Sequence, residues 1–586
     1  MRKREPDRAA APPGSSSVFE KLTLVGITTA AIILLVGLAR VRFFQLDEFV
    51  FVRAAWLISE GQVPYRDFFE HHTPLFYSLL APSLAVLPQQ AGALLAIRLL
   101  CLASAGLLAV STYLLCRSLA GRFESWAATL LLFMMPGFVS RAIEIRPDVL
   151  AAAAFTGASA LLIGRGWSAS GLANAVPGAL VALAILATQK SAQYAWGLLV
   201  VALLMTGQSL RARTFRPGPL LFFLAGFALP LLGLALVLVS LGAWDAFWNQ
   251  NVELALRWQA ADERFPFSRY LGVALRGSAI WGTATAIGIL GLALGAPRGR
   301  SPRDPRLVRF VLIAAPASIS LMLLPNPWPY NFLPVLAVLT PLAALGLGEA
   351  GSRLGAAGGR RAIAAVLALG LLLQVRWFVQ ERERDNSLQV QLVDRVLTLT
   401  TPDTAVFDDN GGYLFRPSAY FLWYHSKAMR ILLRQQLERE LIPELLRSAA
   451  PVWLMDQRFG ELPANVREFV TAHYQPFLGP IHLWGVRLPR SAGAGETAHE
   501  ATFLAIRDGG YFVTSAGLES GGSAEISIDG VVLQLDRPVE LTAGEHRLRV
   551  DGAMPKEGLW VLWVPATGEL WRPTPARGLS LYPYFF

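Results

Sequence analysis

The sequence is poor in charge. Of its 586 residues, 16% are charged and 54% are hydrophobic, whereas soluble domains carry about 25% charged residues. The deficit lies before residue ~380, where apolar runs of about 20 residues recur, each long enough to cross ~30 Å of hydrocarbon. After that point charges return to ordinary density. The composition excludes a soluble enzyme and predicts a polytopic α-helical membrane protein with a soluble C-terminal part.

Cysteine and nucleotide-binding motifs are also scarce. The two cysteines, Cys101 and Cys116, fall in one apolar segment and predict neither a disulfide nor a metal site. No Walker or dinucleotide-binding glycine pattern is present, so cytosolic nucleotide chemistry has no visible site. The net charge of +10 does not indicate nucleic acid, because Lys and Arg lie mostly in short loops where they set membrane orientation.

Eleven apolar segments are long enough to be membrane spans. They are 21–43, 92–118, 122–140, 147–164, 171–189, 191–209, 219–241, 275–295, 308–325, 332–350 and 361–379. The first is expected to be an uncleaved span behind a cytoplasmic tail (1–20), since it is too long for a signal peptide and no small-residue cleavage site follows. Loops rich in arginine alternate with the others, for example the one containing Arg298, Arg300, Arg303, Arg306 and Arg309. The positive-inside rule places them in the cytoplasm, so the odd span count puts the C-terminal part outside.

Residues 74–88 are apolar enough to suggest one more span. Pro74, Pro82 and Pro88 interrupt this short stretch, and a crossing here would place every later arginine-rich loop outside. We therefore predict that 44–91 is one long external loop, lying on or dipping into the outer leaflet. A true span at 74–88, with a different pairing further on, is the alternative.

Two further external segments are expected. Residues 243–276 mix tryptophans with charges, which favours a helix at the membrane interface. Residues 325–331 contain three prolines and two aromatics, which predict a rigid, non-helical cap. The spans and these loops together form a membrane domain over 21–380.

The C-terminal part shows two patterns. Over 381–490 helix-like and strand-like segments alternate, which predicts a small α/β domain. After a small-residue linker at 491–497, short alternating strands and glycine turns over 498–586 predict a β-sandwich. Such modules often bind carbohydrate, but nothing in these residues assigns that role.

Ionisable residues gather in the external loops. The first loop carries Asp47 and Glu48 at its start, and Tyr65, His71 and His72 further on. Carboxylates are costly to hold near hydrocarbon unless they are paired or functional. Other external segments contribute Arg146, Asp148, Lys190 and Tyr330. The alternatives are a solvated loop, structural salt bridges and a snorkelling lysine, yet the predicted topology places all these residues on one face.

This set of residues suits group transfer. A carboxylate can take a proton from an acceptor hydroxyl as that hydroxyl attacks a sugar's anomeric carbon. Arg146, Lys190 or a protonated His72 can stabilise a departing phosphate. No metal is predicted, because two adjacent histidines do not share a helix face as zinc ligands would. A divalent cation between Asp47 and Asp148 is compatible with two carboxylates but is not indicated by them.

The stretch LDEFVFVRAAWLISEGQVPYRDFFEHHTPLFYSLLAP (Leu46–Pro82) resembles the first external loop of GT-C membrane glycosyltransferases. It is most similar to family 39, which includes protein O-mannosyltransferases and the lipid A aminoarabinose transferase. Arg146-Pro-Asp148 resembles the family's second acidic motif, and Lys190 resembles its lysine after the fifth span. The resemblance covers about residues 20–350.

The resemblance implies a function and residue roles. Asp47 would be the general base with Glu48 supporting it, Arg146 and Asp148 would shape the sugar and phosphate pocket, and His72 would contact the carrier phosphate. The expected enzyme is an inverting, metal-independent hexosyl- or pentosyltransferase of a bacterial inner membrane. Its expected donor is a polyprenyl-phosphate sugar, and its acceptor a glycan, lipid or protein.

Two other classes compete with a transferase. A transporter or flippase of lipid-linked sugars would place ionisable groups near the bilayer midplane and often shows internal repeats. Here the charges lie at the outer ends of spans, and no repeat is visible. A non-catalytic receptor with the β-sandwich as sensor would have no use for Asp47, Glu48 and His72. The residues alone leave the sugar, the acceptor and the oligomeric state open.

Overall fold

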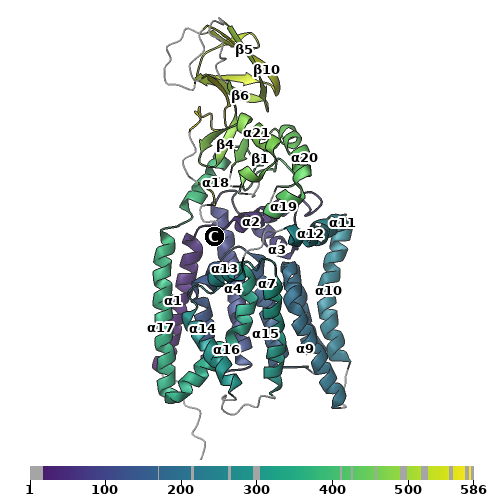
Figure 1. Ribbon diagram of the computed structural model, residues 1–586, viewed down its shortest axis with the longest axis vertical. Coiled ribbons are helices and arrows are strands. Elements are labelled where there is room, and N and C mark those ends of the chain that lie inside the picture. The colour runs from purple at the N-terminus through teal and green to yellow at the C-terminus, as the bar shows by residue number, and fades with distance from the viewer. Residues whose placement is uncertain are drawn as a thin grey trace, which may run out of the picture.

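The protein consists of a helical bundle, a layer of short helices at one end of it, and a C-terminal domain of sheets and helices beyond that layer (Figure 1). The end of the bundle that faces the C-terminal domain is called the upper end below. The computed structural model describes residues 18–168, 170–212, 217–261, 266–294, 304–408, 412–423, 426–455, 458–488, 498–515, 525–552, 558–574 and 580–582. Most of the predicted cytoplasmic tail, the 491–497 linker, and Arg298, Arg300 and Arg303 lie outside these ranges.

Helices form at all eleven predicted spans. They are α1 (Val18–Val41), α4 (Gly92–Arg117), α5 (Arg122–Phe133) with α6 (Pro136–Ala142), α7 (Pro147–Gly164), α8 (Gly171–Ala187), α9 (Ala192–Arg211), α10 (Gly218–Ser240), α14 (Ala279–Ala293), α15 (Pro305–Leu323), α16 (Phe332–Arg353) and α17 (Gly355–Arg382). By length and composition, seven described helices are able to cross a membrane, or nine if two bent pairs each count once. The multi-pass helical architecture is confirmed, and the count of eleven stays a prediction.

The two bent pairs have local causes. α5 and α6 meet at 79°, and Pro136 starts α6, where its missing N–H costs nothing. α13 (Phe267–Ala274) and α14 meet at 106°. Gly277, with φ +73°, lies between them in a backbone conformation that favours glycine. The predicted span 122–140 is therefore not a straight helix, and the predicted span 275–295 begins at a bend.

The first external loop folds into two helices at the upper end of the bundle. They are α2 (Leu46–Ser59) and α3 (Leu75–Leu84). α3 has ten residues, about 15 Å at 1.5 Å per residue, which is half the thickness of the hydrocarbon. Gln89 Nε2 also lies 3.5 Å from Glu60 Oε1. The residues just after α2 and just before α4 are therefore at the same level of the bundle. This geometry fits one loop on a single side of the bundle and does not fit a span at 74–88.

The second external loop also lies at the upper end and begins with α11 at the end of α10 (Figure 1). It forms α11 (Trp244–Phe247), a π-helical turn η2 (Trp248–Glu253), α12 (Leu254–Ala261) and then α13. In the predicted 325–331 cap, Pro329–Asn331 is a single 3-10 turn. The expectation of a non-helical cap is wrong for these three residues, because proline is well suited to the first position of a helical turn.

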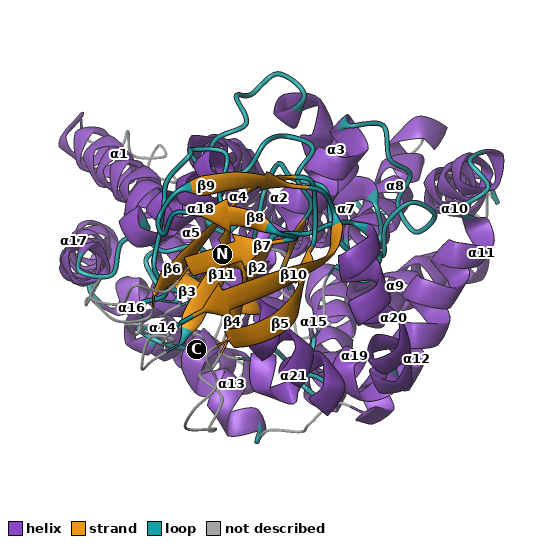
Figure 2. Ribbon diagram, turned by 90° about the horizontal axis from the view of Figure 1, so that it is seen from above, coloured by secondary structure: helices purple, strands orange, loops and turns teal. Residues whose placement is uncertain are grey.

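The C-terminal domain, the described residues from 387 to 582, combines helices with two sheets. Its helices are α18 (Ser387–Leu399), α19 (Lys427–Leu432), α20 (Arg434–Arg447), η4 (Phe459–Glu461) and α21 (Ala464–His473). Its strands are β1 (Val406–Phe407), β2 (Val452–Leu454), β3 (Tyr474–Leu478), β4 (Ile481–Leu488), β5 (Ala498–Ala505), β6 (Gly509–Ser515), β7 (Glu525–Ile528), β8 (Val531–Leu533), β9 (Pro538–Leu541), β10 (Gly544–Asp551) and β11 (Leu559–Trp563). Figure 2, which views the molecule from above, shows the strands lying over the helices of the bundle.

The sheets do not respect the predicted boundary near residue 490. One seven-stranded sheet runs β1-β2-β4-β11-β6-β9, with β3 also on β4, and a second runs β5-β10-β7-β8. β4 from the predicted α/β domain pairs antiparallel with β11 from the predicted β-sandwich, matching Val486 with Val561. The two predicted units therefore share one sheet.

Helix α18 joins the C-terminal domain to the bundle. The Asn386 side chain donates to the Arg40 and Arg42 carbonyls. The buried Gln389 amide accepts from Phe44 N at 2.6 Å and donates to Phe44 O at 2.9 Å and Leu581 O at 2.7 Å. These contacts fix the backbone that leads from α1 into α2.

Candidate active site

Asp47 lies on the first turn of α2, where the helix dipole favours a carboxylate. Its Oδ2 accepts from Arg146 Nη2 at 2.7 Å, and its side chain keeps 30% exposure. Burial by itself would raise the pKa of Asp47, but the charge and hydrogen bond of Arg146 lower it below the ordinary value. Asp47 is therefore an ionised carboxylate that solvent or a ligand can reach.

Glu48, next in sequence, has the opposite environment. It is fully buried, and Arg98 of α4 holds both of its oxygens, with Nε at 2.8 Å from Oε2. Glu48 also accepts from the backbone N–H groups of Gln45 and Ile145 at 2.9 and 3.0 Å. Glu48 fixes the start of α2 and its own oxygens are fully engaged, while its supporting role in catalysis stays a prediction. The sequence reasoning missed Arg98, although an arginine inside an apolar helix was a visible signal.

Arg146 connects Asp47 with a buried ionic network. Its Nε donates to Glu144 Oε2 at 2.9 Å, and its Nη1 lies 3.7 Å from Asp148 Oδ2. Glu144 in turn pairs with Arg42 and Arg141 at 3.1 and 2.8 Å. The guanidinium carbon of Arg146 also lies 4.0 Å above the Tyr330 ring. Salt bridges of the structural kind are therefore present, and they hold Arg146 against Asp47.

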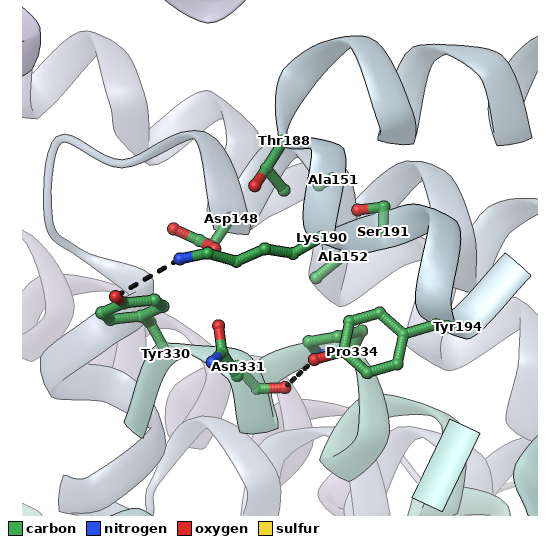
Figure 3. Close-up of a pocket in the computed structure, with 10 residues that line it drawn as sticks. All are labelled: Asp148, Ala151, Ala152, Thr188, Lys190, Ser191, Tyr194, Tyr330, Asn331 and Pro334. Atoms are coloured by element: carbon green, nitrogen blue, oxygen red, sulfur yellow. Dashed lines mark hydrogen bonds between the residues drawn. The ribbon is translucent and has the colours of Figure 1, made fainter. Parts of the chain in front are cut away.

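A small pocket opens beside this network between α7, η1 (Gln189–Ser191) and η3 (Pro329–Asn331). Figure 3 shows Lys190 reaching across it beside Asp148 toward Tyr330. The Lys190 Nζ lies 3.4 Å from Tyr330 Oη. Burial lowers the pKa of Lys190 and Asp148 opposes that shift. The lining residues are Asp148, Ala151, Ala152, Thr188, Lys190, Ser191, Tyr194, Tyr330, Asn331 and Pro334. The lining combines hydroxyls, one amide, one carboxylate and one cation over two alanines, and the cavity of about 10 Å³ has room for about one water-sized group.

The two histidines lie beside Glu70 in the first external loop. His72 Nδ1 is 2.7 Å from Glu70 Oε1, and the two imidazole rings are 3.9 Å apart between centroids. Burial, reinforced by Lys190, lowers the pKa of His72 to about 4. Burial also lowers the pKa of His71 well below its ordinary value. Lowered pKa values favour neutral rings at neutral pH, so positive charge at the site comes from Arg146 and Lys190, and a contact of His72 with the carrier phosphate stays a prediction.

Tyr65 contacts the backbone of the histidine segment. It is 1% exposed, and its hydroxyl donates to His72 O at 2.6 Å. Tyr77, which the sequence reasoning missed, lies 3.0 Å from the same carbonyl. Gln250 of η2 donates to Tyr65 O at 2.8 Å and accepts from Glu70 N at 3.0 Å. The Tyr65 hydroxyl is buried and orients the loop, and its role in substrate binding stays a prediction.

Glu70, His71 and His72 form a cluster with metal-ligand chemistry. Their ligand atoms all lie within 4.8 Å of one another, and Glu70 Oε2 is buried with no hydrogen-bond partner among the described residues. Neutral imidazole and carboxylate are zinc ligand types. The sequence argument against a metal assumed a helix, whereas this segment is a loop in which neighbouring histidines do converge. The expectation of a metal-independent enzyme stays a prediction.

The predicted residues therefore form a connected site. Asp47, Arg146, Asp148, Lys190 and Tyr330 meet at the upper end of the bundle, and the charges of Lys190 and Asp47 also influence the pKa of His72. Glu48 and Tyr65 stand behind this surface as supports.

Comparison with solved structures identifies the fold. No protein-family model matches the chain, and no curated protein matches it in sequence. ArnT from Cupriavidus metallidurans matches in its apo state and bound to undecaprenyl phosphate, both with TM-score 0.56 and 14% identity over 78% of this chain. The matches cover 96% and 95% of the ArnT chains. The protein has the GT-C fold of membrane glycosyltransferases, while membership of family 39 stays a prediction.

Proposed function

We propose that the protein is an inverting glycosyltransferase that moves a monosaccharide from a polyprenyl-phosphate donor to an acceptor at the outer face of a bacterial inner membrane. The observation that carries this proposal is the environment of Asp47. It is an accessible, ionised carboxylate held by Arg146 at 2.7 Å, beside a pocket containing Lys190 and Asp148. The fold shared with ArnT in its undecaprenyl phosphate complex supports the donor class.

In the proposed reaction Asp47 is the general base. An acceptor hydroxyl attacks the anomeric carbon of the donor sugar and forms the new C–O bond, while its proton passes to Asp47. The lowered pKa of Asp47 makes it a weak base. A weak base is sufficient when the transition state resembles an oxocarbenium ion, because the acceptor is then deprotonated late.

The departing polyprenyl phosphate is stabilised by positive charge close to it. The bond between the anomeric carbon and the phosphate oxygen breaks, and its electron pair stays on the polyprenyl phosphate. Arg146 and Lys190 lie on the same side of the site, within 4.0 and 4.6 Å of the Tyr330 ring respectively. Donors preorganised around a developing anion stabilise the transition state. Attack and departure on opposite faces of one sugar ring give inversion.

The second external loop and the C-terminal domain indicate how the carrier lipid and the acceptor would approach the site. The carrier lipid would enter laterally between the first and second external loops, where Gln250 joins the two. The C-terminal domain covers the upper end of the bundle (Figure 1), and would guide a glycan, lipid or protein acceptor.

The test uses full-length protein in lipid nanodiscs with radiolabelled polyprenyl-phosphate sugars and an envelope extract as acceptor. We expect wild type to move label off the lipid and Asp47→Asn to reduce transfer at least about a thousandfold, since it removes the base and its pairing with Arg146. Asp67→Asn is the matched control, because Asp67 lies in the same loop and also pairs with an arginine, Arg66 at 2.8 Å. Equal transfer by Asp47→Asn and wild type would refute the assigned site.

A transporter of lipid-linked sugars is the second candidate, and the same assay separates it. A transporter moves label between leaflets without breaking the bond to phosphate. In this case the label would stay lipid-linked in wild type, and Asp47→Asn would have a smaller effect. The position of the described ionic network at the upper end of the bundle, rather than at its middle, favours the transferase.

A further inference from the structure

The first external loop touches the C-terminal domain directly above the site. The connection between β1 and α19 contributes residues 412–423, here called the strap. The indole N–H of Trp423 donates to Phe69 O at 2.9 Å, and Phe69 N donates to Phe421 O at 3.3 Å. Both backbone hydrogen-bonding groups of Phe69 are therefore held by the strap.

Phe69 in turn lies one residue before Glu70 and packs on His71. The Phe69 and His71 rings are stacked with centroids 6.0 Å apart, and Trp258 of α12 stacks on His71 at 4.9 Å. Glu70 accepts from the N–H groups of His71 and His72 at 2.9 and 3.0 Å. A displacement of Phe69 would therefore move the whole Glu70–His72 segment.

The strap also contacts α2 through the buried side chain of Arg53. Arg53 is fully buried, its guanidinium lies 3.8 Å from the Tyr413 ring centroid, and its Nη1 donates to Tyr413 O at 2.9 Å. Its guanidinium is 5.4 Å from the Trp423 ring. Cation–π contacts are strongest when the partners are desolvated, as they are here. One strap thus contacts both the helix that carries Asp47 and the loop that carries His72.

We propose that Trp423 is a positioning residue of the active site, through which the C-terminal domain sets the geometry of the Glu70–His72 segment relative to Asp47. This inference rests on the proposed function for its catalytic consequence. The positioning itself does not depend on which reaction the site performs. The C-terminal domain is then part of the active site as well as a guide for the acceptor.

The test compares Trp423→Phe with Trp484→Phe. Both tryptophans are buried in the C-terminal domain and donate to a backbone carbonyl, Trp484 to Leu504 O at 3.0 Å. Trp484 packs against Tyr474 and His473 within that domain. Phenylalanine preserves an aromatic ring and removes the donor, so general loss of stability is expected to be similar for the two variants.

Two readouts are made on the full-length protein in nanodiscs. Hydrogen–deuterium exchange of peptides covering 66–74 is expected to be faster in Trp423→Phe and unchanged in Trp484→Phe. In the transfer assay, Trp423→Phe is expected to lower kcat about tenfold, with a smaller change in donor KM, because small misplacements of reacting groups reduce the chemical step.

The two readouts separate this inference from the proposed function. If wild type transfers no sugar, the proposed function fails, and exchange at 66–74 still decides whether Trp423 holds the loop. Unchanged exchange in Trp423→Phe, or equal changes in both variants, would overturn the inference. Faster exchange with kcat preserved would also overturn it, since the loop position would then not matter for transfer.

Discussion

At the residue scale, two adjacent carboxylates on one turn of α2 have opposite environments. Asp47 keeps 30% of its side-chain surface and a single arginine contact of 2.7 Å, whereas Glu48 is fully enclosed and holds Arg98 with both oxygens. Successive residues on a helix point about 100° apart, so one faces the site and the other the bundle. The pair therefore divides into one accessible carboxylate and one fully enclosed carboxylate.

The first prediction concerns pH. Asp47 is ionised above its lowered pKa, so transfer should be lost only as pH falls through a value below the usual ~4. His72, with a pKa of about 4, stays neutral from there upward. We expect kcat/KM for the donor, which reports the free enzyme, to be flat from about pH 5 to 8. A limb near pH 6.5 would show that an imidazole titrates in the site and would contradict the assignment of positive charge to Arg146 and Lys190.

The second prediction concerns stability. Glu48→Gln leaves Arg98 buried without a counter-charge, which typically costs about 3–5 kcal/mol. We expect a clear drop in thermal stability in detergent. The control is Glu349→Gln, which breaks the Glu349–Arg353 pair of 3.2 Å, where the arginine side chain is 73% exposed; such pairs contribute less than about 1 kcal/mol. Equal stability of the two variants would refute the structural role of Glu48.

At the element scale, the first external loop returns to the side from which it left. α3 is too short to cross, and Glu60 and Gln89 lie within 3.5 Å of each other. α9, by contrast, runs 20 residues from the site toward Arg211. Glu60 and Gln89 should therefore be on the same side of the membrane as Asp47, and Arg211 on the other.

Cysteine labelling tests this third prediction. Glu60→Cys and Gln89→Cys should both react with a membrane-impermeant maleimide added from outside, while Arg211→Cys should react only after permeabilisation. The two native cysteines, Cys101 and Cys116, are buried and should give little background. Labelling of Glu60→Cys and Gln89→Cys from opposite sides would contradict this prediction and show that 74–88 crosses the membrane.

At the scale of the whole molecule, the C-terminal domain is one unit joined to the bundle at several points. The seven-stranded sheet includes strands from both predicted units, and Tyr582 returns to Asp408, with its hydroxyl 3.2 Å from Oδ2. The Tyr582 ring also packs on Phe49 of α2, with centroids 5.8 Å apart. The last described residues therefore close over the junction of domain and bundle.

The fourth prediction follows from the shared sheet. A chain ending after Leu488 would expose the edge of β4 that β11 covers over Leu559–Leu562, and unpaired edges promote aggregation. We expect this truncation to aggregate or to be degraded, judged by size-exclusion chromatography in detergent. A monodisperse, active truncation would show that 381–490 folds independently, as the sequence pattern suggested.

The sequence by itself determined the membrane class, the helix at every predicted span and most residues of the site. Runs of apolar residues and loop charges are local signals, since each reports the solvent that its own segment meets. Asp47, Arg146, Asp148 and Lys190 were found because ionisable groups at the ends of apolar helices stand out against their surroundings.

Only the tertiary structure decided which of those residues face the site. Glu48 is enclosed by Arg98 of α4, and Tyr65 by Gln250 of η2, and these partners lie 50 and 185 positions away in sequence, so no local pattern pairs them. The same holds for the sheet that crosses residue 490 and for the strap that holds Phe69 from 352 positions or more away in sequence. Contacts between distant segments depend on how the whole chain packs. Because burial lowers the pKa of His72 and strand pairing joins the two halves of the C-terminal domain, only the packed chain reveals either feature.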